Sequence, residues 1–241
     1  MGIKDFFQFL ASNPNLIHTK QMDLRQRIYL VSKVLCSIYT IKLLFTILQI
    51  TLLENKMVDD IKAVNISSTV LLEAGPILFL LQFPFLGPLL EELGFRAILQ
   101  KGSVLTAAGV SSMVLVLIIL LFKIPVYSIR GSSLLSISIA CAFFLFLLKA
   151  PSILYNIMDI RNTHAQTLLW LNAIAFALWH YYNFDFEQTT AFSVAWYLTP
   201  HFITALILSW VSLKAGFFTA CAVHICNNLL PAVFYIYANS D

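Results

Sequence analysis

The chain has 241 residues, of which 59% are hydrophobic and 11% are charged, and its formal net charge is +3. Soluble domains carry about a quarter charged residues, so this composition excludes an ordinary soluble globular domain and indicates a multi-pass membrane protein. The small net charge, without a run of five or more basic residues, gives no reason to expect nucleic acid as a partner. No obligate protein partner is evident either.

The pattern of apolar segments predicts an all-α fold, a polytopic membrane bundle of about eight transmembrane helices in one domain. Residues 1–27 are predicted to form a cytoplasmic or interfacial segment with a short amphipathic helix over 2–11, and residues 28–241 the transmembrane domain. Pro84 and Pro88 are expected to form an elbow between the second and third helices, and 150–166 to be a polar connection. The expected spans are 28–53, 64–83, 86–101, 104–122, 134–148, 167–182, 191–213 and 217–237.

The third predicted helix carries three charges in an otherwise apolar run, Glu91, Glu92 and Arg96. Glu92 and Arg96 are four residues apart and share a helix face, so they can pair. Gly94, three residues after Glu91, is expected to leave open space beside it. Because one charged side chain at mid-membrane depth costs roughly 2.5–3.5 kcal/mol, three of them together indicate a functional site, with a structural ion pair as the simpler alternative.

Two later helices carry polar residues at the same four-residue spacing, Phe176 with His180 and His224 with Asn228. One helix separates these two, so they run parallel, and the helix with the glutamates runs opposite to them. At 1.5 Å rise per residue, Glu91 and His180 come to a similar depth, with His224 somewhat deeper. The three side chains are therefore predicted to converge inside the membrane.

The three motifs Glu91-Glu92-x-x-x-Arg96, Phe176-x-x-x-His180 and His224-x-x-x-Asn228, in this order, resemble those of the CPBP family of intramembrane proteases. That family includes the type II CAAX prenyl endopeptidases (Ras-converting enzyme) and bacteriocin-immunity-type proteins. The resemblance lies in the motif region 84–230. It implies an endopeptidase acting on a membrane-associated, prenylated or otherwise lipidated protein or peptide, with membrane lipids as its surroundings. We expect an integral protein of a prokaryotic plasma membrane rather than of an organelle.

The resemblance also implies roles for the motif residues. Glu91 would be the general base that activates a water molecule, with Glu92 held by Arg96 as its partner. His180 would share the water or carry the proton, and His224 and Asn228 would donate to the water or to the oxyanion. Spacing alone does not separate Glu91 from Glu92, and Asn227 on the same side of its helix is an alternative to Asn228. Three further residues are given other roles. Trp179 is predicted to lie in an interfacial aromatic belt, and His201 to bond to carbonyls that Pro200 frees. Glu73 is predicted to face the cavity or to extend to the interface.

Metal dependence stays open at this point, because Glu91, His180 and His224 could together hold zinc. No HExxH motif is present, and we favour a water activated without a cofactor. Cys221 and Cys226 are interpreted as packing residues.

Two other functions of the protein remain alternatives to the protease: a non-catalytic membrane scaffold of the immunity type, and a small transporter whose buried Glu and His relay protons. The absence of an internal repeat speaks against the transporter.

Overall fold

The structure, a computed structural model, describes residues 3–11, 22–62, 75–122, 124 and 131–238. These residues confirm the all-α prediction, and the chain is an integral, multi-pass membrane protein. Within the described ranges six helices are long and apolar enough to cross a membrane: Leu24–Glu54, Gly75–Leu99, Ser103–Phe122, Gly131–Lys149, Ala191–Ala215 and Phe217–Ala238. The predicted span 167–182 corresponds to the shorter helix α8.

The described residues form the following helical elements. In chain order they are α1 (Ile3–Ala11), α2 (Leu24–Glu54), the π-helical segment η2 (Gln82–Leu86), α4 (Gly87–Phe95), the 3₁₀ turn η3 (Ala97–Leu99), α5 (Ser103–Phe122), α6 (Gly131–Lys149), α7 (Pro151–Thr163), α8 (Ala165–Trp179), the 3₁₀ turn η4 (His180–Asn183), α9 (Ala191–Ala215) and α10 (Phe217–Ala238).

The expected elbow at Pro84 and Pro88 is wrong, because the chain stays helical from Gly75 through Phe95. Proline lacks an N–H and its ring displaces the carbonyl four residues earlier, which an ordinary α-turn does not tolerate. Here the wider π-turn of η2 contains Pro84, and Pro88 follows in the first turn of α4. Residues 64–74 of the second predicted helix, Glu73 among them, lie outside the described residues.

Helix α7 was missed from sequence, where residues 150–166 read as a polar connection. Pro151 stands in its first turn, where the missing N–H costs nothing. Its Arg161 is buried and donates to the carbonyl of Gln100 and to the Thr106 hydroxyl, while the Gln100 amide donates to Ser212 on α9. This polar network joins the end of the α4–η3 segment to α5, α7 and α9.

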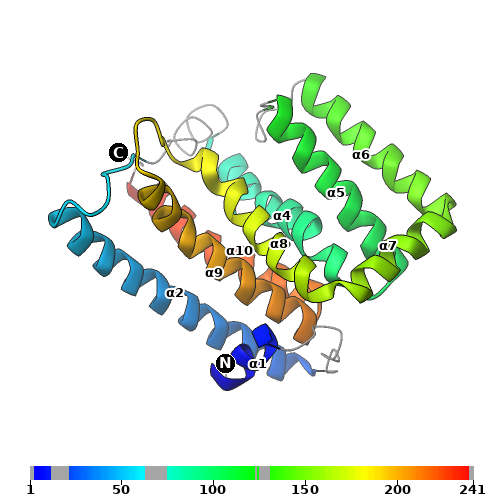
Figure 1. Ribbon diagram of the computed structural model, residues 1–241, viewed down its shortest axis with the longest axis horizontal. Helices are drawn as coiled ribbons and strands as arrows, with labels where there is room; N and C mark the ends of the chain where they lie inside the picture. The colour runs from blue at the N-terminus through cyan, green and yellow to red at the C-terminus, as the bar shows by residue number, and fades with distance from the viewer. Residues whose placement is uncertain (1–2, 12–21, 63–74, 123, 125–130, 239–241) are drawn as a thin grey trace.

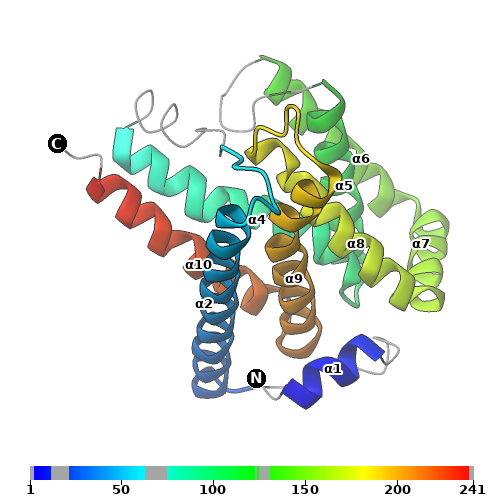
Figure 2. The ribbon, with the colours of Figure 1, turned by 60° about the vertical axis from the view of Figure 1, so that its left-hand side comes forward.

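Helices α4, α8, α9 and α10 lie together in the middle of the molecule, with α2 along one side and α5, α6 and α7 along the other (Figures 1 and 2). The three helices that intervene between the glutamates and α8, namely α5, α6 and α7, therefore lie outside α4 and do not separate it from α8. Helices α8 and α10 run in one direction and α4 in the opposite one, as the sequence predicts. Helix α1 packs on α9, where Phe6 contacts Trp210.

Helix α5 and the turn η3 pack closely against each other at Gly109 of α5. A Cβ atom built there would clash with the backbone nitrogen of Ile98 in η3 and would lie 2.9 Å from the Cα atom of the same residue. Gly94, in contrast, does not border open space as the sequence suggested. A Cβ atom there would meet Val116 and Ser112 of α5 at 3.6 and 3.9 Å, which are ordinary contacts.

We therefore expect Gly109→Ala to destabilise the protein. The backbone of η3 would have to move, and overpacking costs about 1–3 kcal/mol, which exceeds the gain in helix propensity of at most about 1 kcal/mol from replacing Gly by Ala. Gly94→Ala is the matched control and should leave the melting temperature unchanged or slightly higher. Thermal unfolding of both variants in detergent measures this, and equal melting temperatures would contradict the close α5–η3 contact.

Candidate active site

The two glutamates of α4 have different surroundings although they are neighbours in sequence. Glu92 is fully buried, and its Oε1 lies 2.8 Å from Nδ1 of His224 and 3.4 Å from a guanidinium nitrogen of Arg96. The Glu91 side chain is 14% exposed, and its Oε1 accepts a hydrogen bond of 3.2 Å from the Trp179 indole. Glu92 is thus held in the core, whereas Glu91 is the more accessible carboxylate.

Arg96 is also fully buried, and three elements hold its guanidinium. It pairs with Glu92 one turn earlier on α4, donates to the carbonyl of Ala205 on α9, and lies 4.1 Å over the ring of Phe176 on α8. A desolvated cation over an aromatic face is a favourable contact. The four-residue spacing of Phe176 and His180 therefore has a physical reason: the phenyl ring covers Arg96, and the imidazole one turn later faces Glu91.

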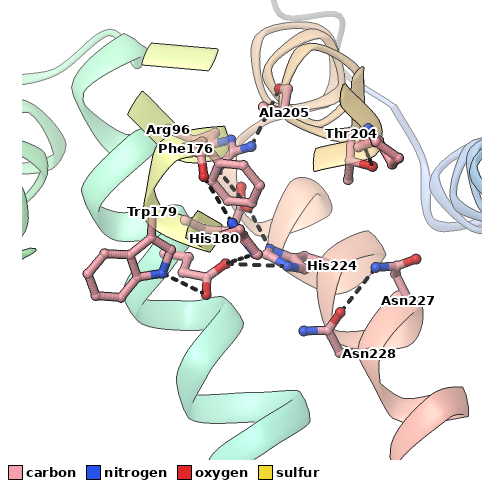
Figure 3. Close-up of polar contacts among 12 residues, drawn as sticks. Arg96, Phe176, Trp179, His180, Thr204, Ala205, His224, Asn227 and Asn228 are labelled. Atoms are coloured by element: carbon pink, nitrogen blue, oxygen red, sulfur yellow. Dashed lines mark hydrogen bonds and ion pairs between the residues drawn. The ribbon is translucent and has the colours of Figure 1, made fainter. Parts of the chain in front are cut away.

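Two histidines from different helices face the same oxygen of Glu91. Their Nε2 atoms lie 4.0 Å (His180) and 3.6 Å (His224) from Glu91 Oε2 (Figure 3). The other ring nitrogen, Nδ1, lies 2.9 Å from the Phe176 carbonyl oxygen in His180 and 2.8 Å from the Glu92 carboxylate in His224. Both partners are acceptors, so each Nδ1 donates. When both rings are neutral, two Nε2 lone pairs and a carboxylate oxygen meet.

Three acceptors repel one another unless something donates to them. Glu91 Oε2 is buried and has no hydrogen-bond partner among the described residues. A water molecule between the groups, or a proton on one imidazole, resolves this conflict, and distances of 3.6 and 4.0 Å are those at which a bridging water is expected. The arrangement therefore suits the binding of a small hydrogen donor at Glu91.

Trp179 and His201 contribute to the site although the sequence analysis gave them other roles. The Trp179 indole donates to Glu91 rather than standing in an aromatic belt. The His201 ring stacks on that of His180, with 4.1 Å between the centroids. The signal in the sequence was a third histidine inside an apolar helix, next to Pro200, but a single sequence does not tell which neighbour such a ring faces.

Asn228 lies beside the convergence point rather than in it. It is half-buried one turn after His224, and its Oδ1 accepts a 3.1 Å hydrogen bond from Nδ2 of Asn227. Asn227 in turn accepts from Lys42 of α2 at 2.8 Å. Of the six predicted site residues, five therefore share direct contacts. The sixth, Asn228, contacts Asn227 (Figure 3), which in turn joins α10 to α2.

No group of three or more His, Cys, Asp or Glu side chains is arranged to hold a metal ion within the described ranges. The donor types at Glu91, His180 and His224 are nevertheless those that zinc accepts, and each imidazole already has the outer hydrogen bond that metal-bound histidines make. Cys221 packs among apolar side chains, as predicted, whereas Cys226 is exposed.

Comparison with known protein families gives a match. The family model described as type II CAAX prenyl endopeptidase Rce1-like matches residues 73–230. These residues contain α4, α8 and the first part of α10, up to residue 230, with all three motifs, and leave α1 and α2 outside. No curated protein and no solved structure matches the chain.

The buried Glu92–Arg96 pair leads to a prediction about stability. Replacing Arg96 by Met leaves the Glu92 carboxylate buried without its cation, which we expect to lower the free energy of unfolding by about 3–5 kcal/mol. Arg25→Met, at an exposed position of α2, is the control and should change little. Chemical unfolding in detergent measures both, and the double variant Glu92→Gln/Arg96→Met should recover part of the loss. Equal stability of the two single variants would contradict the pairing.

Proposed function

We infer the function from the premise that this chain belongs to the type II CAAX prenyl endopeptidase Rce1-like family. We propose that it is an intramembrane endopeptidase that hydrolyses a peptide bond in a membrane-associated protein or peptide, with a water molecule activated by Glu91. The observation that carries this proposal is the Glu91 Oε2 atom, which is buried without a hydrogen-bond partner among the described residues and faces the Nε2 atoms of two histidines at distances that a water molecule can bridge.

The reaction follows from the positions of these groups. Water donates one hydrogen bond to Glu91 and a second to Nε2 of His180. These two bonds orient the water so that one of its lone pairs points at the substrate carbonyl carbon. As the new O–C bond forms, Glu91 takes the proton from the water. The proton then passes, through His180, to the nitrogen of the leaving amine as the C–N bond breaks. Glu91 is the better candidate for the base because Glu92 is fully buried between a cation and an imidazole.

The developing oxyanion needs hydrogen-bond donors, and two residues of α10 are placed to supply them. His224 donates a hydrogen bond from Nδ1 to the Glu92 carboxylate, which stabilises a positive charge on the imidazole ring. The Nε2–H of the charged ring can then donate to the oxyanion. The Asn228 amide, one turn further along, supplies the second donor. Such donors are worth most where water is excluded, as in this apolar bundle.

A cavity beside α4 supports a lipidated substrate. It has a volume of about 340 Å³, and its largely apolar walls come from α4, α5 and α6. Leu90, the neighbour of Glu91, lines it on the α4 side. Cavities of a few hundred Å³ with apolar walls suit hydrophobic ligands. We propose that the lipid chain of the substrate lies here, so that α5 and α6 bind the substrate while α8 and α10 contribute to the chemistry.

We expect Glu91→Gln to lower peptide hydrolysis by at least about 100-fold, because general base catalysis contributes about 10²–10⁴, while the melting temperature stays near that of the wild type. Glutamine keeps the acceptor for Trp179 and loses only the basic carboxylate. Glu187→Gln, in an exposed loop, is the matched control. Cleavage is measured by mass spectrometry on peptides offered with and without a prenyl group.

Each outcome of that assay has a distinct meaning. Wild-type cleavage that is lost in Glu91→Gln supports the protease. Full activity of the variant would remove the proposed base, and loss of folding would assign Glu91 a structural role. Wild-type protein that binds these peptides but cleaves none of them would favour the non-catalytic scaffold.

Metal dependence is tested separately. If zinc bound, Glu91, His180 and His224 would hold it, and it would supply Lewis-acid activation of the water. Our proposal uses no metal, so purified active protein should contain far less than one zinc per chain, and chelator should leave its rate unchanged. Elemental analysis alongside the assay decides this, and one zinc per active chain with loss of activity on chelation would replace the metal-free proposal.

A further inference from the structure

Helix α2 lies outside the region matched by the family model, yet its Lys42 reaches the site. The Lys42 ammonium donates a 2.8 Å hydrogen bond to Oδ1 of Asn227 on α10. Lys42 stands in the interior of the apolar helix Leu24–Glu54, where a cation costs roughly 2.5–3.5 kcal/mol. It has no carboxylate partner among the residues that the structure describes. A lysine retained at such a cost is a candidate for a functional role.

A second contact fixes where α2 lies against α10. In a regular helix the carbonyl of Asn227 would accept from the N–H of residue 231, but Pro231 has none. The Tyr39 hydroxyl of α2 donates to this carbonyl at 3.2 Å. Tyr39 and Lys42 are three residues apart and so share a helix face. The proline therefore creates the docking point that brings Lys42 to the Asn227 side chain.

The chemistry of the ammonium group sets the direction of the hydrogen bonds that follow. Lysine only donates, so it must face the oxygen of the Asn227 amide and not its nitrogen. The Asn227 NH₂ is then turned to Oδ1 of Asn228, at 3.1 Å. With its oxygen occupied in this way, Asn228 presents its own NH₂ as the group free to donate.

We propose that Lys42 is a positioning residue for catalysis: acting through Asn227, it holds the Asn228 amide with its N–H groups toward the substrate carbonyl oxygen. This inference rests on the proposed function, because an oriented donor matters only if an oxyanion forms. Without Lys42, each amide can turn by 180° and Asn228 would present its carbonyl oxygen to the developing negative charge. A donor would thus be exchanged for a repelling acceptor.

The kinetic test compares variants that separate orientation from anchoring. Lys42→Arg keeps a donor-only cation and should keep most of the kcat. Lys42→Met should lower kcat by up to about 100-fold, as for the loss of an oxyanion donor, with KM little changed. Lys33→Met, on the exposed face of α2, is the matched control and should behave as wild type. The kcat of the double variant Lys42→Met/Asn227→Leu should be no lower than that of either single variant, because both substitutions interrupt the same series of hydrogen bonds.

Asn227→Asp is the most informative variant. An ionised aspartate still accepts from Lys42, and as an ion pair it keeps α2 on α10, but it has no NH₂ to donate to Asn228. A lower kcat with an unchanged melting temperature supports the relay. Wild-type kcat in Asn227→Asp would overturn it and leave Lys42 a structural contact. This comparison stays valid if Lys42→Met fails to fold.

A readout without turnover separates this proposal from the protease itself. In protein labelled with ¹⁵N-asparagine, the side-chain amide resonance that is lost in Asn228→Ala identifies Asn228. It should shift in Lys42→Met and Asn227→Asp, and stay in place in Lys33→Met and, nearly, in Lys42→Arg. An unmoved resonance in both variants overturns the relay even if the enzyme is active. A moved resonance in a chain that cleaves no peptide supports the relay while the proposed function fails.

Discussion

The site depends on one buried carboxylate that two other side chains share. Glu92 is fully buried and lies between the Arg96 guanidinium and the His224 imidazole. A buried carboxylate is tolerable only when its charge and its acceptor positions are matched, so both partners have to be present and close. Because Arg96 also contacts Phe176 of α8 and Ala205 of α9, this one charge fixes α4, α8, α9 and α10 relative to one another.

This constraint also explains why two adjacent glutamates differ. Neighbours on a helix point about 100° apart, so burying Glu92 among its partners turns Glu91 toward the space between α8 and α10. There it meets the Trp179 indole and the Nε2 atoms of two histidines. The paired carboxylate provides the support, and the accessible one is left for chemistry. The spacing in the sequence could not distinguish these two roles, whereas the burial of each side chain does.

Much of this was readable from the sequence because charge in an apolar helix is expensive and therefore informative. The i, i+4 pairs Glu92–Arg96 and Phe176–His180, and the opposite direction of α4 to α8 and α10, follow from helix geometry and the number of crossings. Trp179 and His201 were not found, because aromatic rings are common in membrane helices and their contacts come from helix rotation, which one sequence does not fix. The continuous helix through Pro84 was missed for a related reason: a π-turn accommodates the proline without any sign in the composition.

The polarity of the hydrogen bonds links the two halves of the site. On the α4 side, Arg96 pairs with Glu92, Trp179 donates to Glu91, and Glu91 Oε2 is left as a buried acceptor without a partner among the described residues. On the α2 side, the series begins with an ammonium group that can only donate and passes through two amides to a free NH₂. A site with acceptors at one end and donors at the other matches what amide hydrolysis requires, a place to take a proton from water and a place to hold an oxyanion. Because the donor end is supplied by a helix outside the matched family region, the orientation of a motif residue here depends on a part of the chain that carries no motif.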